Sequence, residues 1–141
     1  MSVLNVLGMA SIRHERRINA PADVVWDVIA RPESIVEWFP GVVAATMEGA
    51  IRTITLASGM EMPEEILTVD PSQRRFAYRI TAPLYRFHLG VIDVIELGEG
   101  DSLCVYSTTA EPDTLALIIA GGSIGALNEI QRIAEALAKE T

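Results

Sequence analysis

The sequence predicts an α+β fold in which a seven-stranded antiparallel sheet curves around one long C-terminal helix. Three observations indicate this fold. An extended segment and two short helical segments open the chain, about six strand-like runs follow, and a long helical pattern closes it. The short links between successive strands favour antiparallel hairpins. One long helix cannot cover a whole face of such a sheet, so the curved sheet should leave an internal cavity beside the helix.

The first 39 residues predict one strand and two short helices. Residues 10–18 are extended in character, and Pro21 suits the first turn of a helix over 22–29, where apolar residues recur with helical spacing. Pro32 ends this helix, because the residue before a proline avoids the helical region. A second short helix is expected over 32–39.

From residue 42 the pattern indicates strands, and from residue 113 it indicates a helix that runs to about residue 139. Asp113 or Thr114 could cap this helix. We expect Gly121, Gly122 and Gly125 to leave room for a ligand or a bend. One stripe of the helix should face inward; it consists of Ile119, Ser123, Ala126, Ile130, Ala134 and Leu137.

Composition excludes several classes of function. The 141 residues fit one domain, and 11 basic against 19 acidic side chains give a net charge of −8, which argues against nucleic acid and anionic membranes as partners. Cys104 is the only cysteine, and His14 and His88 are far apart, so we expect no disulfide, metal or cofactor and an intracellular, cytoplasmic protein. The longest apolar run is too short for a membrane span, and residues 1–10 lack the features of an export signal.

Five segments carry a family resemblance that extends over about residues 11–137. They are Ile18-Asn19-Ala20-Pro21-Ala22-Asp23-Val24-Val25-Trp26, Trp38-Phe39-Pro40-Gly41-Val42, Gly49-Ala50-Ile51-Arg52, Glu64-Glu65-Ile66-Leu67-Thr68-Val69-Asp70 and Arg75-Phe76-Ala77-Tyr78-Arg79-Ile80. Together they resemble the polyketide cyclase/dehydrase and lipid-transport superfamily (SRPBCC), which includes START-type and Bet v 1-like helix-grip proteins. The resemblance implies a single helix-grip domain over residues 1–141 with a cavity for a hydrophobic ligand. The gate loops of the related abscisic-acid receptors are not evident, which argues against hormone reception.

The resemblance also implies which residues face the cavity. It places the family's acidic residue at Glu64, its aromatic residue at Tyr78 with Ile80 beside it, and its tyrosine-like position at His88. Strand alternation agrees within each strand, because it puts Glu64 on one face with Ile66 and Thr68, and His88 on one face with Gly90. The remaining lining implied by the resemblance is Gly90 and Ser107.

Glu64, His88 and Tyr78 are the candidate catalytic residues. Burial of Glu64 in an apolar cavity should raise its pKa and suit it to acid/base work, whereas a place at the rim or a structural pair with Arg52 would not. His88 could exchange a proton with Glu64 or could simply line the cavity. The Tyr78 hydroxyl could polarise a carbonyl or pack at an edge.

Further side chains could line the cavity. Trp38 and Phe39 could stack on a planar ligand or wedge the short helices against the sheet. Tyr106 and Cys104 are interpreted as packing residues. From the C-terminal helix, the lining prediction comprises Ile119, Ser123, Ala126 and Ile130.

These features predict a protein that binds a small polyketide-like, lipid-like or polycyclic molecule. As an enzyme it would be a metal-free cyclase or dehydratase, a lyase or isomerase in which Glu64 or His88 takes an α-proton and Tyr78 or Ser107 holds the enolate oxygen. As a carrier or sensor it would need no titrating group. A helix-mediated interaction protein is the third alternative, and monomer and homodimer both stay open.

Overall fold

The computed structural model describes residues 8–140 and confirms the predicted α+β architecture. The N-terminal residues 1–7, for which we expected no export signal, lie outside the described residues. The elements are β1 (Ala10–Ile18), α1 (Ala22–Ile29), the 3-10 turn η2 (Pro32–Ser34), α2 (Ile35–Trp38), β2 (Val42–Glu48), β3 (Ile51–Leu56), β4 (Glu61–Asp70), β5 (Arg75–Ile80), β6 (Phe87–Gly98), β7 (Asp101–Glu111) and α3 (Asp113–Ala138).

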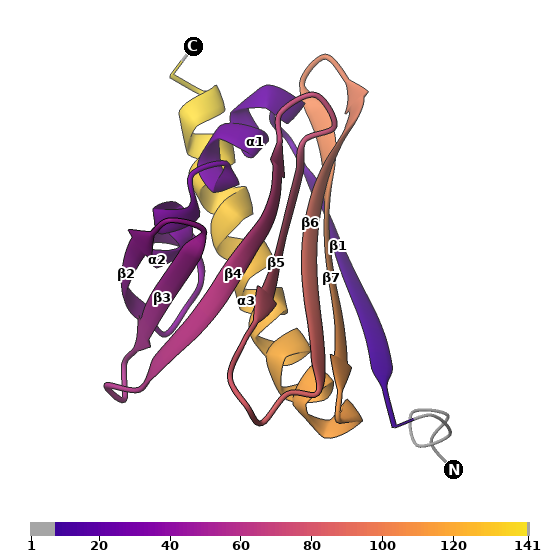
Figure 1. The fold of residues 1–141 in the computed structure, drawn as a ribbon. Coiled ribbons are helices and arrows are strands. Elements are labelled where there is room, and N and C mark those ends of the chain that lie inside the picture. Colours follow the sequence, from indigo (N-terminus) through magenta and orange to yellow (C-terminus); the bar gives the residue numbers. More distant parts are fainter. Residues whose placement is uncertain (1–7, 141) are drawn as a thin grey trace.

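The seven strands form one antiparallel sheet in the order β1-β7-β6-β5-β4-β3-β2. Consecutive strands from β2 to β7 are neighbours, and β1 returns beside β7. Figure 1 shows the sheet curving around α3, with β2 and β3 on one side of the helix and β7 and β1 on the other. Helix α3 packs against β1 and β7 and also contacts α1 and α2.

One end of the sheet and helix assembly forms a solid apolar core. Helix α1 packs against α3 there (Figure 1), and Val25 and Ile29 of α1 are fully buried. Leu127 and Ile130 of α3 belong to the same core cluster. Close packing of such side chains is the main source of stability in this end of the molecule.

Three details of the predicted elements are corrected by the structure. Pro112 is the N-cap of α3, without a side-chain hydrogen bond, so neither Asp113 nor Thr114 caps the helix. Leu137 is 42% exposed, because in the last turn of α3 Ala138, not Leu137, packs against the core. In β4, Ile66 pairs with Tyr78 but Thr68 pairs with Ala77, so a β-bulge takes Thr68 off the face that Glu64 occupies.

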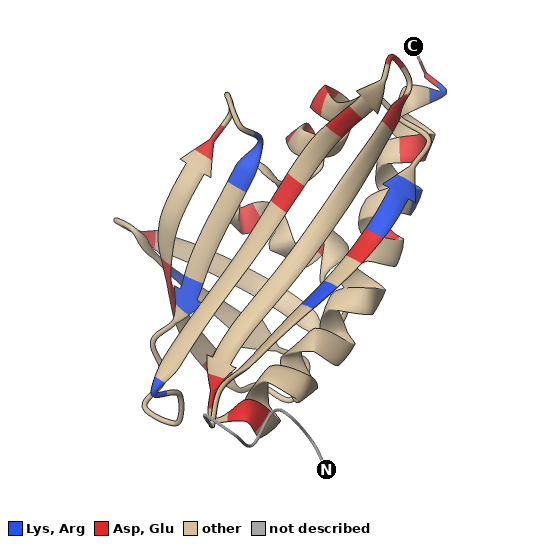
Figure 2. Ribbon diagram, turned by 90° about the vertical axis from the view of Figure 1, so that its right-hand side faces the viewer, with Lys and Arg blue, Asp and Glu red and all other residues tan. Residues whose placement is uncertain are grey.

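Charged residues on the outer face of the sheet are scattered and paired. Figure 2 shows acidic and basic positions interspersed along the strands. Arg75 donates to Asp93 at 2.7 Å and Arg79 to Glu65 at 2.6 Å. These ion pairs leave the face without a continuous basic surface of the kind that binds a phosphate backbone, as far as residues 8–140 show.

Helix α3 would be long and apolar enough to span a bilayer if length and hydropathy were the only criteria. The core helix of a water-soluble protein passes the same test. Here the helix packs against β1 and β7 and buries residues such as Leu127 and Ile130, whereas Leu117 and Ile118 are exposed.

Candidate functional site

An apolar cavity of about 240 Å³ lies between the first half of α3 and strands β3, β4 and β5. The space exists where neither α1 nor the C-terminal half of α3 fills the concave face of the sheet. Its wall is almost entirely apolar, with one carboxylate. The lining residues are Ile35, Phe39, Val42, Ile54, Leu56, Met62, Glu64, Tyr78, Ile80, Tyr85, Ile118, Ile119 and Gly122.

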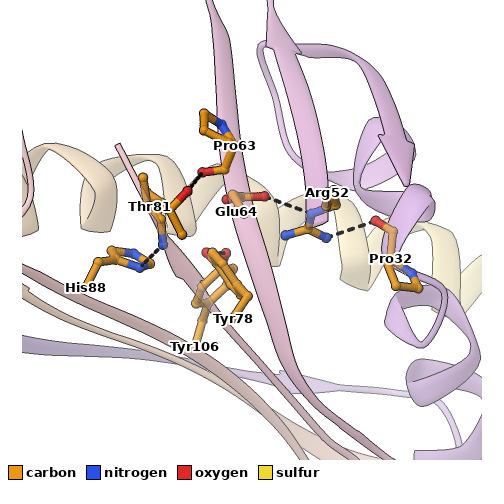
Figure 3. Close-up of polar contacts among 9 residues, drawn as sticks. Pro32, Arg52, Pro63, Glu64, Tyr78, Thr81, His88 and Tyr106 are labelled. Atoms are coloured by element: carbon orange, nitrogen blue, oxygen red, sulfur yellow. Dashed lines mark hydrogen bonds and ion pairs between the residues drawn. The ribbon is translucent and has the colours of Figure 1, made fainter. Parts of the chain in front are cut away.

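Glu64 lies on the cavity wall and forms an ion pair with Arg52 inside the protein. The two residues pair across β3 and β4, and Arg52 Nε donates to Glu64 Oε1 at 2.8 Å. Arg52 Nη1 also donates to the carbonyl oxygen of Pro32 at 2.9 Å (Figure 3). Arg52 is 1% and Glu64 2% exposed, so the rim position considered for Glu64 is wrong. The ion pair with Arg52 is confirmed.

Burial and the ion pair act on Glu64 in opposite directions. Loss of water around the carboxylate raises the pKa of Glu64, and the nearby Arg52 guanidinium lowers it by less, so the net shift is upward. A buried carboxylate with a raised pKa can accept and return a proton closer to neutral pH than an exposed one.

Tyr78 and Tyr106 meet beside this ion pair. Their hydroxyl oxygens are 2.5 Å apart and both side chains are buried, with the guanidinium carbon of Arg52 5.1 Å from the centre of the Tyr78 ring. Burial raises the pKa of Tyr78 and of Tyr106 well above the usual value, so both phenols stay protonated; one hydroxyl group donates to the other, and the second keeps its proton for another acceptor. Sequence pattern predicts Tyr106 only as a packing residue and does not reveal this pair.

His88 has a different geometry from the one expected of a base. Its Nδ1 accepts a hydrogen bond from the backbone N–H of Ile80 at 2.9 Å, which assigns the proton to Nε2 (Figure 3). Burial lowers the pKa of His88 to about 4, so the ring is neutral at pH 7. His88 does not line the main cavity; it lines an adjoining cavity of about 290 Å³ that shares Ile80 and Tyr85 with it.

Glu64 and His88 therefore do not form the expected hydrogen-bonded acid/base couple. Each is hydrogen-bonded elsewhere, Glu64 to Arg52 and His88 to the Ile80 amide. Four buried side-chain polar atoms have no partner within the described part of the chain: Arg52 Nη2, His88 Nε2, Ser102 Oγ and Thr108 Oγ1. A buried donor without a partner is costly, and only His88 among these residues lines one of the two adjoining cavities, which makes its Nε2 a candidate for contact with a ligand.

The aromatic and helical lining residues divide into two groups. Phe39, Ile80 and Ile119 line the cavity. Trp38 does not, because its ring is buried in the core and Nε1 donates to Ser34 Oγ at 3.1 Å. The cavity meets α3 at Ile118, Ile119 and Gly122, on the flank of the buried stripe. The lining prediction is therefore corrected for the residues of that stripe, which are core or deeply buried: Ser123, Ala126 and Ile130.

Ser107 and Gly90 are also corrected. Alternation along β7 buries Tyr106 and Thr108 inside, so Ser107 points to the outer face of the sheet and cannot hold an enolate oxygen in the cavity. Gly90 faces inward but is covered by the ring of Tyr78, which separates it from the cavity. Within residues 8–140, no group of three histidine, cysteine, aspartate or glutamate side chains is placed to hold a metal ion.

The curved sheet, the long helix and the cavity between them define the helix-grip class of ligand-binding folds. The family model for polyketide cyclase / dehydrase and lipid transport matches residues 9–139. The chain belongs to this family. No curated protein sequence matches the chain at a significant level.

Solved structures share the fold at low sequence identity. XoxI from Bacillus cereus is 22% identical, with a TM-score of 0.80 over 87% of this chain and 94% of that one. The Zhui aromatase/cyclase from a Streptomyces species is 22% identical, with a TM-score of 0.73 over 90% and 94% of the two chains. Norcoclaurine synthase from Thalictrum flavum, in complex with dopamine and hydroxybenzaldehyde, is 19% identical, with a TM-score of 0.73 over 100% and 94%. At these identities the likeness establishes the fold alone.

Proposed function

We propose that the protein binds a small hydrophobic, polyketide-like molecule in the 240 Å³ cavity and assists its cyclisation by acid/base chemistry, in the cytoplasm and without a metal. The observation that carries the proposal is the single buried carboxylate, Glu64, on an otherwise apolar wall. Apolar walls select the ligand by shape, and the few polar groups orient it. The family and the likeness to an aromatase/cyclase support this class of substrate.

The neighbouring groups supply the rest of the chemistry. Glu64 takes a proton from the carbon between two carbonyl groups, and the enolate carbon attacks a second carbonyl of the same molecule. The hydroxyl group of Tyr78, which lines the cavity and is hydrogen-bonded to that of Tyr106, provides a donor for the oxygen that develops negative charge. Glu64 returns its proton to the new alkoxide, and loss of water completes the dehydration. His88 lines the adjoining cavity and takes no part in this scheme.

The test compares Glu64→Gln with Glu65→Gln, using a synthetic β-polyketo thioester as substrate. Glu65 is adjacent in β4 but points outward and pairs with Arg79, so it controls for the loss of a strand carboxylate. We expect Glu64→Gln to lower kcat by about 10²-fold or more with binding retained, and Glu65→Gln to leave kcat unchanged. Equal activity in both variants would refute the catalytic role of Glu64.

A non-catalytic carrier or sensor is the second candidate function. It is favoured by the hydrogen bond that engages His88 Nδ1, because this bond removes the second proton-transfer group from the site. Native mass spectrometry of the purified protein tests it: a carrier would retain a hydrophobic ligand that the wild type never converts. Conversion of that ligand by the wild type would refute the carrier function.

A further inference from the structure

Two glycines lie directly against aromatic side chains of the cavity wall. A Cβ atom placed on Gly90 would lie 2.5 Å from Cζ of Tyr78 and 2.8 Å from its hydroxyl oxygen. A Cβ atom placed on Gly122 would lie 3.0 Å from Cζ of Phe39. These distances are shorter than ordinary van der Waals contacts, so a methyl group at either position must displace the ring.

Displacement of either ring changes the wall of the cavity. Tyr78 pairs with Gly90 across β5 and β6, and its ring lies between Gly90 and the cavity that it lines, so movement away from Gly90 leads into the cavity. Phe39 and Gly122 lie side by side on the cavity wall, and Phe39 packs against Tyr106, with ring centres 6.4 Å apart. Phe39 also borders a surface hollow with Pro40 and Gly125, so a methyl group on Gly122 moves the ring along the wall that the two residues share and changes the shape of the cavity.

Gly121 provides a natural contrast on the same helix. It is the neighbour of Gly122, but a Cβ atom placed on it would meet no atom within 4 Å, and it is exposed to solvent. From the sequence, the helix glycines are predicted to leave room for a ligand or a bend. At Gly122 that room is occupied by Phe39, and at Gly125 by Pro40, whose Cγ would lie 3.2 Å from an added Cβ.

We propose that Gly90 and Gly122 are specificity-determining positions, which set the largest flat, fused-ring ligand that the cavity admits by letting Tyr78 and Phe39 lie back from it. The inference rests on the proposed function, because it concerns the ligand of the same cavity. It assigns the selection by size to two backbone positions rather than to the polar groups. An alanine at Gly90 has the larger effect, since its contact with Tyr78 is the shorter one.

The test measures affinities of the full chain for phenol, 2-naphthol and 2-anthrol by isothermal titration calorimetry. These probes share one hydroxyl group and differ in the number of fused rings. For the largest probe that the wild type binds, we expect Gly122→Ala to weaken binding at least tenfold and Gly121→Ala less than twofold. Gly90→Ala should weaken it further. In the double variant G122A/F39L, the smaller side chain should restore the affinity to within threefold of the wild type.

The outcomes separate this inference from the proposed function. If the wild type binds a probe and Gly122→Ala binds it equally well, the inference is overturned while the ligand-binding function stands. If the wild type binds none of the three probes, the proposed function fails and the inference fails with it. If Gly90→Ala does not fold, the comparison of Gly122→Ala with Gly121→Ala still tests whether a glycine on the cavity wall determines which ligands bind.

Discussion

The two halves of α3 pack differently against the same sheet. In the C-terminal half, Leu127 and Ile130 are almost fully buried in a core completed by α1. In the N-terminal half, Ile118 is 71% exposed and, with Ile119, lines the cavity. The apolar residues of one helix thus build a solid core at one end and the wall of a hollow at the other.

The difference arises from what else covers the sheet. At the C-terminal end of α3, the helix α1 supplies large side chains such as Val25 and Ile29 that fill the concave face. At the other end α3 faces β3, β4 and β5 across the cavity, and Ile35 and Phe39 reach it from α2 and its C-terminal end. The buried ion pair of Arg52 and Glu64 lies on this side, where Glu64 is part of the cavity wall.

Breaking the ion pair on the cavity side should give the largest effect. Arg52→Met leaves the Glu64 carboxylate buried without its cation, which should cost about 3 to 5 kcal/mol in the free energy of unfolding. Urea unfolding followed by circular dichroism measures this loss. The double variant R52M/E64M removes both charges and should regain most of the stability. A loss below about 1 kcal/mol in Arg52→Met would show that the pair is solvated.

A matched pair of substitutions on α3 compares the two halves directly. Ile130→Ala leaves a hole in the solid core and should cost about 3 to 4 kcal/mol. Ile119→Ala only enlarges an existing cavity and should cost about 1 kcal/mol. Thermal unfolding of the two variants measures the difference. Equal losses would contradict the division of the helix into a packed half and a cavity-lining half.

The pH dependence of stability tests the state of His88. Its pKa falls from 6.5 to about 4 on folding, so between these values the unfolded chain binds the extra proton and acid destabilises the fold. Lowering the pH from 6.5 to 4 should remove up to about 3 kcal/mol through this group. In His88→Gln this contribution disappears, and the difference between the two unfolding curves isolates it. If stability depends on pH in the same way in the wild type and in His88→Gln, the His88 ring is protonated as readily in the folded protein as in the unfolded chain.

The tyrosine pair should give the smallest effect. Tyr106→Phe removes one partner of the 2.5 Å hydroxyl contact and should lower stability by about 1 kcal/mol. Tyr85→Phe serves as the control, because Tyr85 is only partly buried and its ring contacts are retained. Equal stability of Tyr106→Phe and the wild type, measured by urea unfolding, would argue against a stabilising hydrogen bond.

Local pattern in the sequence was sufficient for the order of elements and for one buried carboxylate. The inward positions of Glu64, Tyr78 and His88 were implied by the family resemblance, and alternation within each strand agreed with them; all three side chains are buried. The inward position that the resemblance implied for Ser107 is wrong, and β7 has small, polar and apolar residues on both faces, so only its pairing with β6 decides which face is buried. The bulge near Leu67 changes the alternation in β4 without a glycine or proline signal.

The residues that line the cavity were harder to predict from the sequence than the existence of the cavity. The helix stripe of Ser123, Ala126 and Ile130 is inward, as expected, but the hollow lies to one side of it, and that offset depends on where Phe39 and α1 pack. The direction of His88 depends on a single backbone amide, that of Ile80. Such contacts join residues through tertiary structure, and no local pattern records them.

The aromatic contacts around Trp38 should make its intrinsic fluorescence sensitive to the state of the cavity. The Trp38 indole lies with its ring centre 6.1 Å from that of Phe39, which lines the cavity, and 6.4 Å from that of Tyr106. Trp26, the other tryptophan, belongs to α1. With Trp26 replaced by phenylalanine, the fluorescence emission comes from Trp38 alone and should change when a ligand occupies the cavity. Binding and release of an unlabelled ligand could then be followed in real time.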